Sequence, residues 1–316
     1  MAYDDIISRS DASALVPEQV SMQLMEAIAT TSIVAQTFQR IPVASNAVRF
    51  PVLQALPQAY WVSPTDVGMK QTTEAVWANT NMNIEEIASI VVIPDSVVAD
   101  VSVDIWSQVR GYLANAAVRT LDSAVFFGTN KPSSVPDSIL DQAIDAGNVY
   151  SQGTSTTAQG GLAGDFNGTF ALVEDDGFAV NGVVAKASLR AAMRNTRDTS
   201  GQLVSDFGVD SVYGQRVFYG MDGLWPTTGR TDYYPSAFVG DWSKFLLGIR
   251  QDITYSVHRD GVITDNTGAI QFNLMQQDMT ALRIVMRVGW VAANPVRYAN
   301  SDANTRFPAA VLGIPD

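Results

Sequence analysis

The strongest constraint on this chain is a long helical pattern between residues 103 and 127. Apolar and small side chains recur there every three or four positions and so share one face of an α-helix: Ile105, Val109, Leu113, Ala116, Thr120 and Ala124. Asp100 or Ser102 can cap the start of this helix, and Gly128 can end it. At 1.5 Å per residue it would be about 37 Å long. The pattern predicts one long helix that buries a single continuous face.

Few side chains are available for catalysis. Cysteine is absent and His258 is the single histidine, so Cys–His catalysis is excluded and any Ser–His pair would need that one imidazole. We expect His258 at a strand end before a turn, in a structural or solvent-facing role. Gly160–Gly164 lacks the Lys-Ser/Thr of a phosphate loop. Asp4-Asp5 and Asp175-Asp176 lack the spaced carboxylates of a calcium loop. The sequence therefore predicts no enzyme, no cofactor and no metal.

The net charge and the composition limit the classes of partner that the chain is expected to bind. Its net charge of −12 argues against a protein that grips nucleic acid, because clustered Lys and Arg supply phosphate binding. The acidity fits either ordinary solubility or a wall that encloses nucleic acid without holding it. No apolar run approaches the ~20 residues that cross a bilayer, and we expect no secretion signal. A length of 316 residues allows one large core or two smaller ones.

Residues 1–46 have the pattern of an arm. Pro17 can occupy the first turn of an amphipathic helix that places Val20, Leu24 and Ile28 on one face. Such a helix lacks a core of its own, so another subunit would have to cover it. The alternative is a helix that packs on its own domain.

Residues 47–80 are expected to form a long hairpin. Val48, Phe50 and Val52 alternate as in a strand, and a second extended run covers residues 72–84. Tyr60 and Trp61 precede a turn-rich tip, residues 62–68. The hairpin either projects from its domain or forms an ordinary sheet edge.

The remaining chain reads as one domain inserted into another. Ile87–Ile93 predicts a buried strand, and residues 131–241 predict the inserted domain. Within it, Ser151–Gly168 is rich in Gly, Ser and Thr and predicts a mobile loop, whereas Ala185–Arg197 predicts a helix with Leu189 and Met193 facing inward. Two later strands, residues 246–257 and 282–291, then return to the first domain.

Two phrases in the last third carry a family resemblance. Residues 240–254 (GDWSKFLLGIRQDIT) and 281–295 (ALRIVMRVGWVAANP) resemble the late segment of major capsid proteins of tailed phages. Phe126–Asn130 (FFGTN) resembles the close of that family's spine helix. The family has the Hong Kong 97 type of fold, which encapsulins share. Nearly the whole chain follows the family's order of arm, hairpin, strand, spine helix, inserted domain and returning strands.

The resemblance implies an α+β capsid fold and a structural function. It assigns residues 1–46 to an N-terminal arm, 47–80 to an extended hairpin loop, 81–130 and 246–316 to a peripheral domain with the spine helix, and 131–245 to an axial domain. Copies would assemble as hexamers and pentamers into an icosahedral shell around double-stranded DNA, in the host cytoplasm, with a portal protein and without a membrane. A separate scaffolding protein, or none, and a decoration protein stay open. The alternatives are an encapsulin-like compartment and a β-rich surface adhesion protein.

The resemblance also identifies candidate contact residues. Those between subunits are Tyr60, Trp61, Asp66 and Lys70 of the hairpin, with Leu24 and Ile28 of the arm. Some relatives join subunits through a Lys–Asn isopeptide bond that a Glu assists. Alignment on Pro295 places the Asn position at Asp278 and the acid position at Val285, which leaves Lys70 as the one candidate lysine. We therefore expect that the covalent cross-link is lost and that the shell is held by buried surface.

Overall fold

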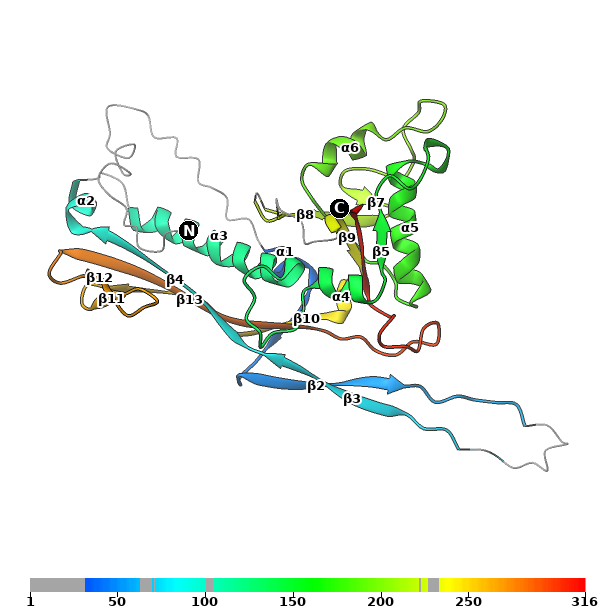
Figure 1. The fold of residues 1–316 in the computed structure, drawn as a ribbon, viewed down its shortest axis with the longest axis horizontal. Coiled ribbons are helices and arrows are strands. Elements are labelled where there is room, and N and C mark those ends of the chain that lie inside the picture. The colour runs from blue at the N-terminus through cyan, green and yellow to red at the C-terminus, as the bar shows by residue number, and fades with distance from the viewer. Residues whose placement is uncertain are drawn as a thin grey trace. The chain divides into compact units, whose positions relative to one another are not determined.

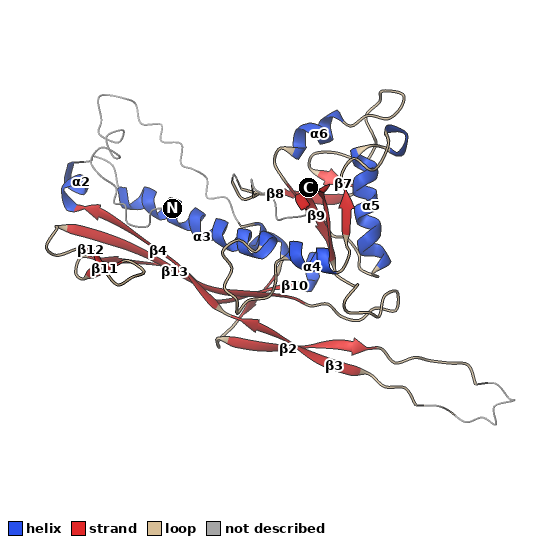
Figure 2. Ribbon diagram, in the orientation of Figure 1, coloured by secondary structure: helices blue, strands red, loops and turns tan. Residues whose placement is uncertain are grey.

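A computed structural model describes residues 32–62, 70, 72–100, 105–221, 223–226 and 233–315. The fold is mixed α+β (Figures 1 and 2). The chain divides into two compact units. The first unit comprises Glu86–Thr120 and Gln251–Val288, and the second comprises Ser32–Glu85, Leu121–Arg250 and the chain from Gly289 onward. Each unit is described separately below.

The elements alternate irregularly along the chain. The helices are α1 (Ile33–Thr37), α2 (Asp95–Asp100), α3 (Ile105–Phe127), α4 (Ile139–Asp145), α5 (Leu162–Asp175) and α6 (Leu189–Asn195), with 3₁₀ turns η3 (Thr157–Gln159) and η4 (Trp242–Lys244). The strands are β1 (Gln39–Pro42), β2 (Ala47–Ala55), β3 (Val76–Asn83), β4 (Glu85–Pro94), β5 (Val149–Ser151), β6 (Gly182–Ala185), β7 (Ser211–Val212), β8 (Gln215–Tyr219), β9 (Tyr233–Gly240), β10 (Phe245–His258), β11 (Val262–Thr264), β12 (Ile270–Asn273), β13 (Met279–Ala292) and β14 (Ala309–Pro315).

The predicted long helix is present as α3, and in the first unit it covers a sheet. Ile105, Val109 and Leu113 lie on its buried face and pack against Leu282 and Ile284 of β13. In the strand order β1-β10-β13-β4, β1 pairs with the part of β10 that belongs to the second unit. Helix α3 ends at Phe127, and Gly128 follows it with a φ of +68°, the left-handed conformation that favours glycine after a helix.

The spacing of apolar residues therefore predicted this helix up to Phe127 but only the first half of its buried face. Ala116 and Thr120 of the predicted face are exposed, and Ala117 and Leu121 are buried in their place, because a helix of 3.6 residues per turn brings those positions back to the buried side.

The first unit also carries a short hairpin, β11–β12. Its strands pair antiparallel, Val262 opposite Asn273. Ile263 and Phe272 pack with Val92 of β4 in a small apolar cluster. Among the described residues, none of the helices, α3 included, is long and apolar enough to span a membrane.

The second unit is built on a six-stranded sheet in the order β5-β14-β9-β6-β8-β7. Strand β14 runs parallel to β5 and antiparallel to β9. Helix α5 contributes Phe166, Phe170 and Val173 to the core of this unit, where they meet Ala310 and Leu312 of β14. Because β14 belongs to this sheet, the end of the segment 246–316 lies with strands of the segment 131–245, although the sequence prediction had grouped it with the other domain.

Two local predictions within this unit were wrong at their boundaries. The segment Ser151–Gly168, predicted to be a mobile loop, contains η3 and the start of α5. The buried carboxylate of Asp165 orders it by accepting hydrogen bonds from the Gly153 and Ser155 amides, at 2.7 and 2.8 Å. The helix predicted from Ala185 begins at Leu189, because Ala185 pairs in β6 with β8 and β9. Leu189 and Met193 are buried as predicted.

Aromatic side chains fill the second unit where α3 ends. Phe126 lies 5.2 Å from Phe238 of β9 and 5.9 Å from Trp242 of η4, measured between ring centroids. Phe38, between α1 and β1, stacks on Phe245 at 5.1 Å. These contacts place α1 and β1, which precede the hairpin, against the rest of the second unit.

Candidate assembly hairpin and its base

Strands β2 and β3 form a two-stranded ribbon with no third strand in the part of the chain that the structure describes. Ala47 pairs with Asn83 at one end and Ala55 with Val76 at the other. Pro51 lies within β2, which is allowed because both strands of such a ribbon are edges. Beyond the paired region, residues 56–62 and 72–75 continue as two extended segments (Figure 1). An isolated ribbon of this kind is at best marginally stable in water.

The base of the ribbon is held by an apolar cluster. Met82 and Ile84 are buried against Val43 and Val291. Val48 and Phe50 of β2 are partly buried on the same cluster, so these two alternating residues that predicted the strand face the apolar cluster. The ribbon therefore has a core at its base, whereas the side chains farther along it remain exposed.

Two glycines make room for this base. A Cβ atom at Gly289 of β13 would lie 2.2 Å from the backbone oxygen of Asn83. A Cβ atom at Gly248 of β10 would lie 2.4 Å from the sulfur of Met82. Both glycines belong to the two phrases that carry the family resemblance. Their role is steric, because they let the end of β3 approach two strands of the sheet closely.

Hydrogen bonds reinforce the base on two sides. The Asn83 side chain donates to the Ser134 carbonyl at 2.6 Å, and the Ser134 hydroxyl donates to the Glu85 carboxylate at 2.5 Å. On the β2 side, the Val296 amide donates to the Leu53 carbonyl at 2.9 Å. The Tyr298 hydroxyl donates to the Pro57 carbonyl, also at 2.9 Å. These bonds fix the direction in which the ribbon leaves the second unit.

Large apolar side chains lie exposed on the ribbon and its extensions. Trp61 is fully exposed and Tyr60 is 44% exposed, as their proposed contact role requires. Trp77, which sequence reasoning did not single out, is 65% exposed. It lies within the predicted second run, where a tryptophan next to several asparagines was the available signal. Lys70 is exposed, whereas Asp66, Leu24 and Ile28 lie outside the described residues.

The two positions aligned with the cross-link chemistry are both described in the first unit. Asp278 precedes β13 and has a φ of +51°, and its backbone carbonyl accepts from the Asp95 amide at 2.9 Å. Val285 is buried in β13. Its carbonyl accepts from the Thr254 hydroxyl at 3.2 Å. A buried valine offers no group that could exchange a proton with a neighbouring lysine or amide.

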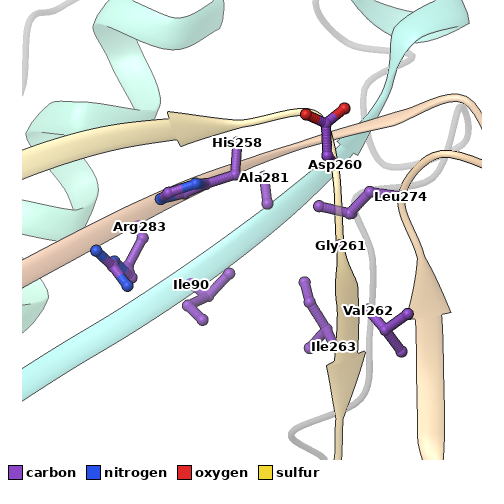
Figure 3. A pocket seen from close by; sticks show the side chains of 9 residues that line it. All are labelled: Ile90, His258, Asp260, Gly261, Val262, Ile263, Leu274, Ala281 and Arg283. Atoms are coloured by element: carbon purple, nitrogen blue, oxygen red, sulfur yellow. The ribbon is translucent and has the colours of Figure 1, made fainter.

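The single histidine lies where the sequence predicted, at the end of β10. It lines a pocket of about 160 Å³ with Ile90, Asp260 and Arg283 of the same unit (Figure 3). The His258 imidazole is hydrogen-bonded to the Ser256 hydroxyl at 2.9 Å, and Figure 3 shows the Asp260 carboxylate pointing away from it. These groups do not form the oriented base and nucleophile of a hydrolytic site. Among the described residues, no group of three or more His, Cys, Asp or Glu side chains is arranged so that it could hold a metal ion.

The fold and the exposed hairpin together define a class of protein. A long helix on a sheet, a second compact unit and an exposed hairpin without a partner are the parts of a capsid fold. The chain belongs to the phage capsid family, whose model matches residues 12–297. Its function is therefore that of a major capsid protein of tailed phages.

Individual relatives agree over nearly the full length. The chain is 22% identical to the major capsid protein of Staphylococcus phage 80alpha, over 94% of this chain and 87% of that protein. A solved chain from Microbacterium phage Oxtober96 is 34% identical with a TM-score of 0.81, and it matches 99% of this chain and 100% of its own. A chain from Mycobacterium phage Adephagia is 30% identical with a TM-score of 0.82, over 99% of both chains. A chain from the capsid of a native GTA particle shares the fold at 14% identity, with a TM-score of 0.67 over 98% of this chain and 99% of its own.

Proposed function

We propose that copies of this chain assemble as hexamers and pentamers into a closed icosahedral shell that encloses double-stranded DNA. The observation that carries the proposal is the β2–β3 ribbon, which has one small core at its base and exposed tryptophans beyond it. Family membership supports assembly from many copies. The ribbon supplies a physical reason why a single copy is incomplete.

The ribbon has two properties of an obligate contact element. Its two strands have no third strand beside them among the described residues, and soluble proteins normally cover or protect such sheet edges. Its tryptophans are large apolar groups, and such side chains dominate the energy of subunit interfaces when they are buried. A neighbouring copy that covers Trp61 and Trp77 would bury the exposed tryptophans and protect the open strand edges. Tyr60 and Lys70 would lie in the same contact, and Asp66 is proposed to join them at the tip.

The other parts of the chain take the roles that the resemblance implies. Residues 1–31 would act as an arm on a neighbouring copy, with Leu24 and Ile28 as its contacts, whereas residues 32–46 of the predicted arm pack within the second unit of their own copy. Residues 131–245, together with β14, would surround the symmetry axes, and residues 81–130 and 246–308 would form the shell wall between them. Assembly would take place in the host cytoplasm around a portal protein, with a scaffolding or decoration protein as an optional further partner.

The proposal is tested by removing the exposed aromatic groups. The double variant Trp61→Ser, Trp77→Ser should fold, because neither side chain belongs to the apolar cluster at the base, but should form no closed shells in negative-stain micrographs. Tyr112→Ser is the matched control, since it removes a side chain that is 58% exposed in the other unit. Far-ultraviolet circular dichroism verifies folding. Normal shells from the double variant, at the yield of the parent protein, would contradict the proposal.

A further inference from the structure

Helix α3 carries a buried carboxylate that is aimed at α1. Asp122 is 0% exposed. It accepts hydrogen bonds from the Ser32 hydroxyl and from the Ile33 and Val34 amides, the latter two at 3.0 and 3.4 Å. Ser32 in turn caps α1, because its hydroxyl accepts from the Ala35 amide at 3.1 Å. The first turn of α1 is thus hydrogen-bonded to the two carboxylate oxygens of Asp122 on α3.

The donors to this carboxylate are a hydroxyl and two amides, and no cation is among the groups that shift the pKa of Asp122. The surroundings are apolar: Phe38 follows α1, Phe126 lies one turn farther along α3, and the two rings are 6.5 Å apart. Arg40, the cation in contact with α1, is exposed and donates to the Ala35 carbonyl at 2.8 Å instead. Burial raises the pKa of Asp122 to about 6, although the Ser32, Ile33 and Val34 hydrogen bonds lower it. Desolvation therefore outweighs hydrogen bonding at this group.

We propose that Asp122 is a positioning residue that holds α1 against α3, and that the protonation of its carboxyl group sets how firmly α1 is held. The neutral carboxyl holds α1 firmly, because a buried neutral acid avoids the desolvation cost of a charge. The ionised carboxylate holds α1 less firmly, because it gains hydration whenever α1 moves away.

The direction of the pH dependence follows from proton linkage. A carboxyl whose pKa is raised in the closed state binds more protons there than in the hydrated, open state. The stabilisation is complete below the ordinary pKa of an aspartic acid and is lost as pH rises to about 6. Within that window the opening equilibrium changes by at most about tenfold per pH unit. Above it, the opening equilibrium should be constant.

Hydrogen exchange of the full-length protein tests the proposal directly. The amides of Ile33, Val34 and Ala35 report on the contact, because each donates to Asp122 or Ser32. After correction for intrinsic exchange rates, their protection should fall by about tenfold or more between pH 4.5 and 7. Amides in the buried strand β14 of the same unit serve as the internal reference, and their protection should not fall over this pH range.

Three variants distinguish this role from ordinary packing. Asp122→Asn removes the charge with little change in shape, and it should abolish the pH dependence of α1 protection. Ser32→Ala should keep the pH dependence but lower protection most at pH 7, when the carboxylate has lost a donor. The matched control is Asp175→Asn, which removes an exposed carboxylate and should behave like the parent. If Asp122→Asn does not fold, Ser32→Ala decides the question. A flat profile in the parent, an unchanged profile in Asp122→Asn, or an equal fall in β14 would each overturn the proposal.

Discussion

At the scale of single residues, the tightest constraints come from positions where a side chain is missing. Gly248 and Gly289 are ordinary glycines in two β-strands, yet both face the end of β3. The two contacts differ in kind: at Gly289 the obstacle is a backbone carbonyl, whereas at Gly248 it is the end of a methionine side chain. A backbone oxygen held in a sheet cannot move aside, but a thioether can adopt another rotamer.

Gly289→Ala should therefore destabilise the subunit more than Gly248→Ala does. Overpacking of a well-packed core costs about 1–3 kcal/mol, and we expect the first variant at the upper end of that range and the second at the lower end. Urea unfolding of the unassembled subunit, monitored by tryptophan fluorescence, gives both free energies of unfolding. Equal losses in the two variants would show that the Asn83 carbonyl is not the fixed obstacle.

Sequence reasoning reached some residues and missed others for physical reasons. The spacing of apolar residues predicted the buried positions Ile105, Val109 and Leu113 of α3, but it also placed Ala116 and Thr120 on that face, and both are exposed. The roles of Gly248 and Gly289 do not follow from spacing, because the groups that they accommodate lie more than 150 residues away in the sequence. Asp122 was overlooked for a similar reason: a polar residue within an amphipathic helix is expected on its exposed side, and its partner Ser32 comes from α1.

At the scale of elements, the β2–β3 hairpin was the best predicted part of the candidate site. Alternation at Val48, Phe50 and Val52 gave the strand, and Pro51 was compatible with it because the ribbon has two edges. The segment after β5 was the poorest prediction. Its Gly- and Ser-rich composition suggested mobility. In the structure, however, two backbone amides of this segment donate hydrogen bonds to the buried carboxylate of Asp165, which holds the segment in a fixed turn. Composition records the freedom of a segment, not the tertiary hydrogen bonds that remove it.

Deletion of residues 63–71 should separate folding from assembly. The apolar base at Met82 and Ile84 and the bonds to Leu53 and Pro57 lie outside the deleted segment, so the subunit should keep its circular dichroism spectrum and its melting temperature to within a few degrees. Shells should be absent from negative-stain micrographs. An unfolded product would mean instead that the tip contributes to the stability of the subunit itself.

At the scale of the whole molecule, sequence order predicted the fold class and family but not every sheet partner. The order of hairpin, strand, spine helix and returning strands is visible along the chain. The pairing of β14 with β5 and β9 is not, since it joins segments about 70 to 160 residues apart. Pairing over such distances depends on the complete core rather than on local pattern.

We expect shells of this protein to be held without covalent links between subunits. Asp278 and Val285 stand where the reactive amide and its assisting acid would be, so the shell must rely on many small contacts. At about 25 cal/mol per Å² of apolar surface, a few thousand Å² per subunit gives ample gross stabilisation. Boiled particles should give one band near 34.0 kDa in denaturing electrophoresis. A ladder of dimers to hexamers would show that another lysine and another acceptor form a bond.

The position of β14 has a consequence for the order of events during synthesis. Translation delivers β5, β6, β7, β8 and β9 first, and β14, which must lie between β5 and β9, comes last of the six. Until then β5 has no neighbour, one edge of β9 stays open, and the core around Phe166 and Phe170 lacks Ala310 and Leu312. A chain that has been synthesised only as far as β13 therefore cannot complete this sheet or the core beneath it.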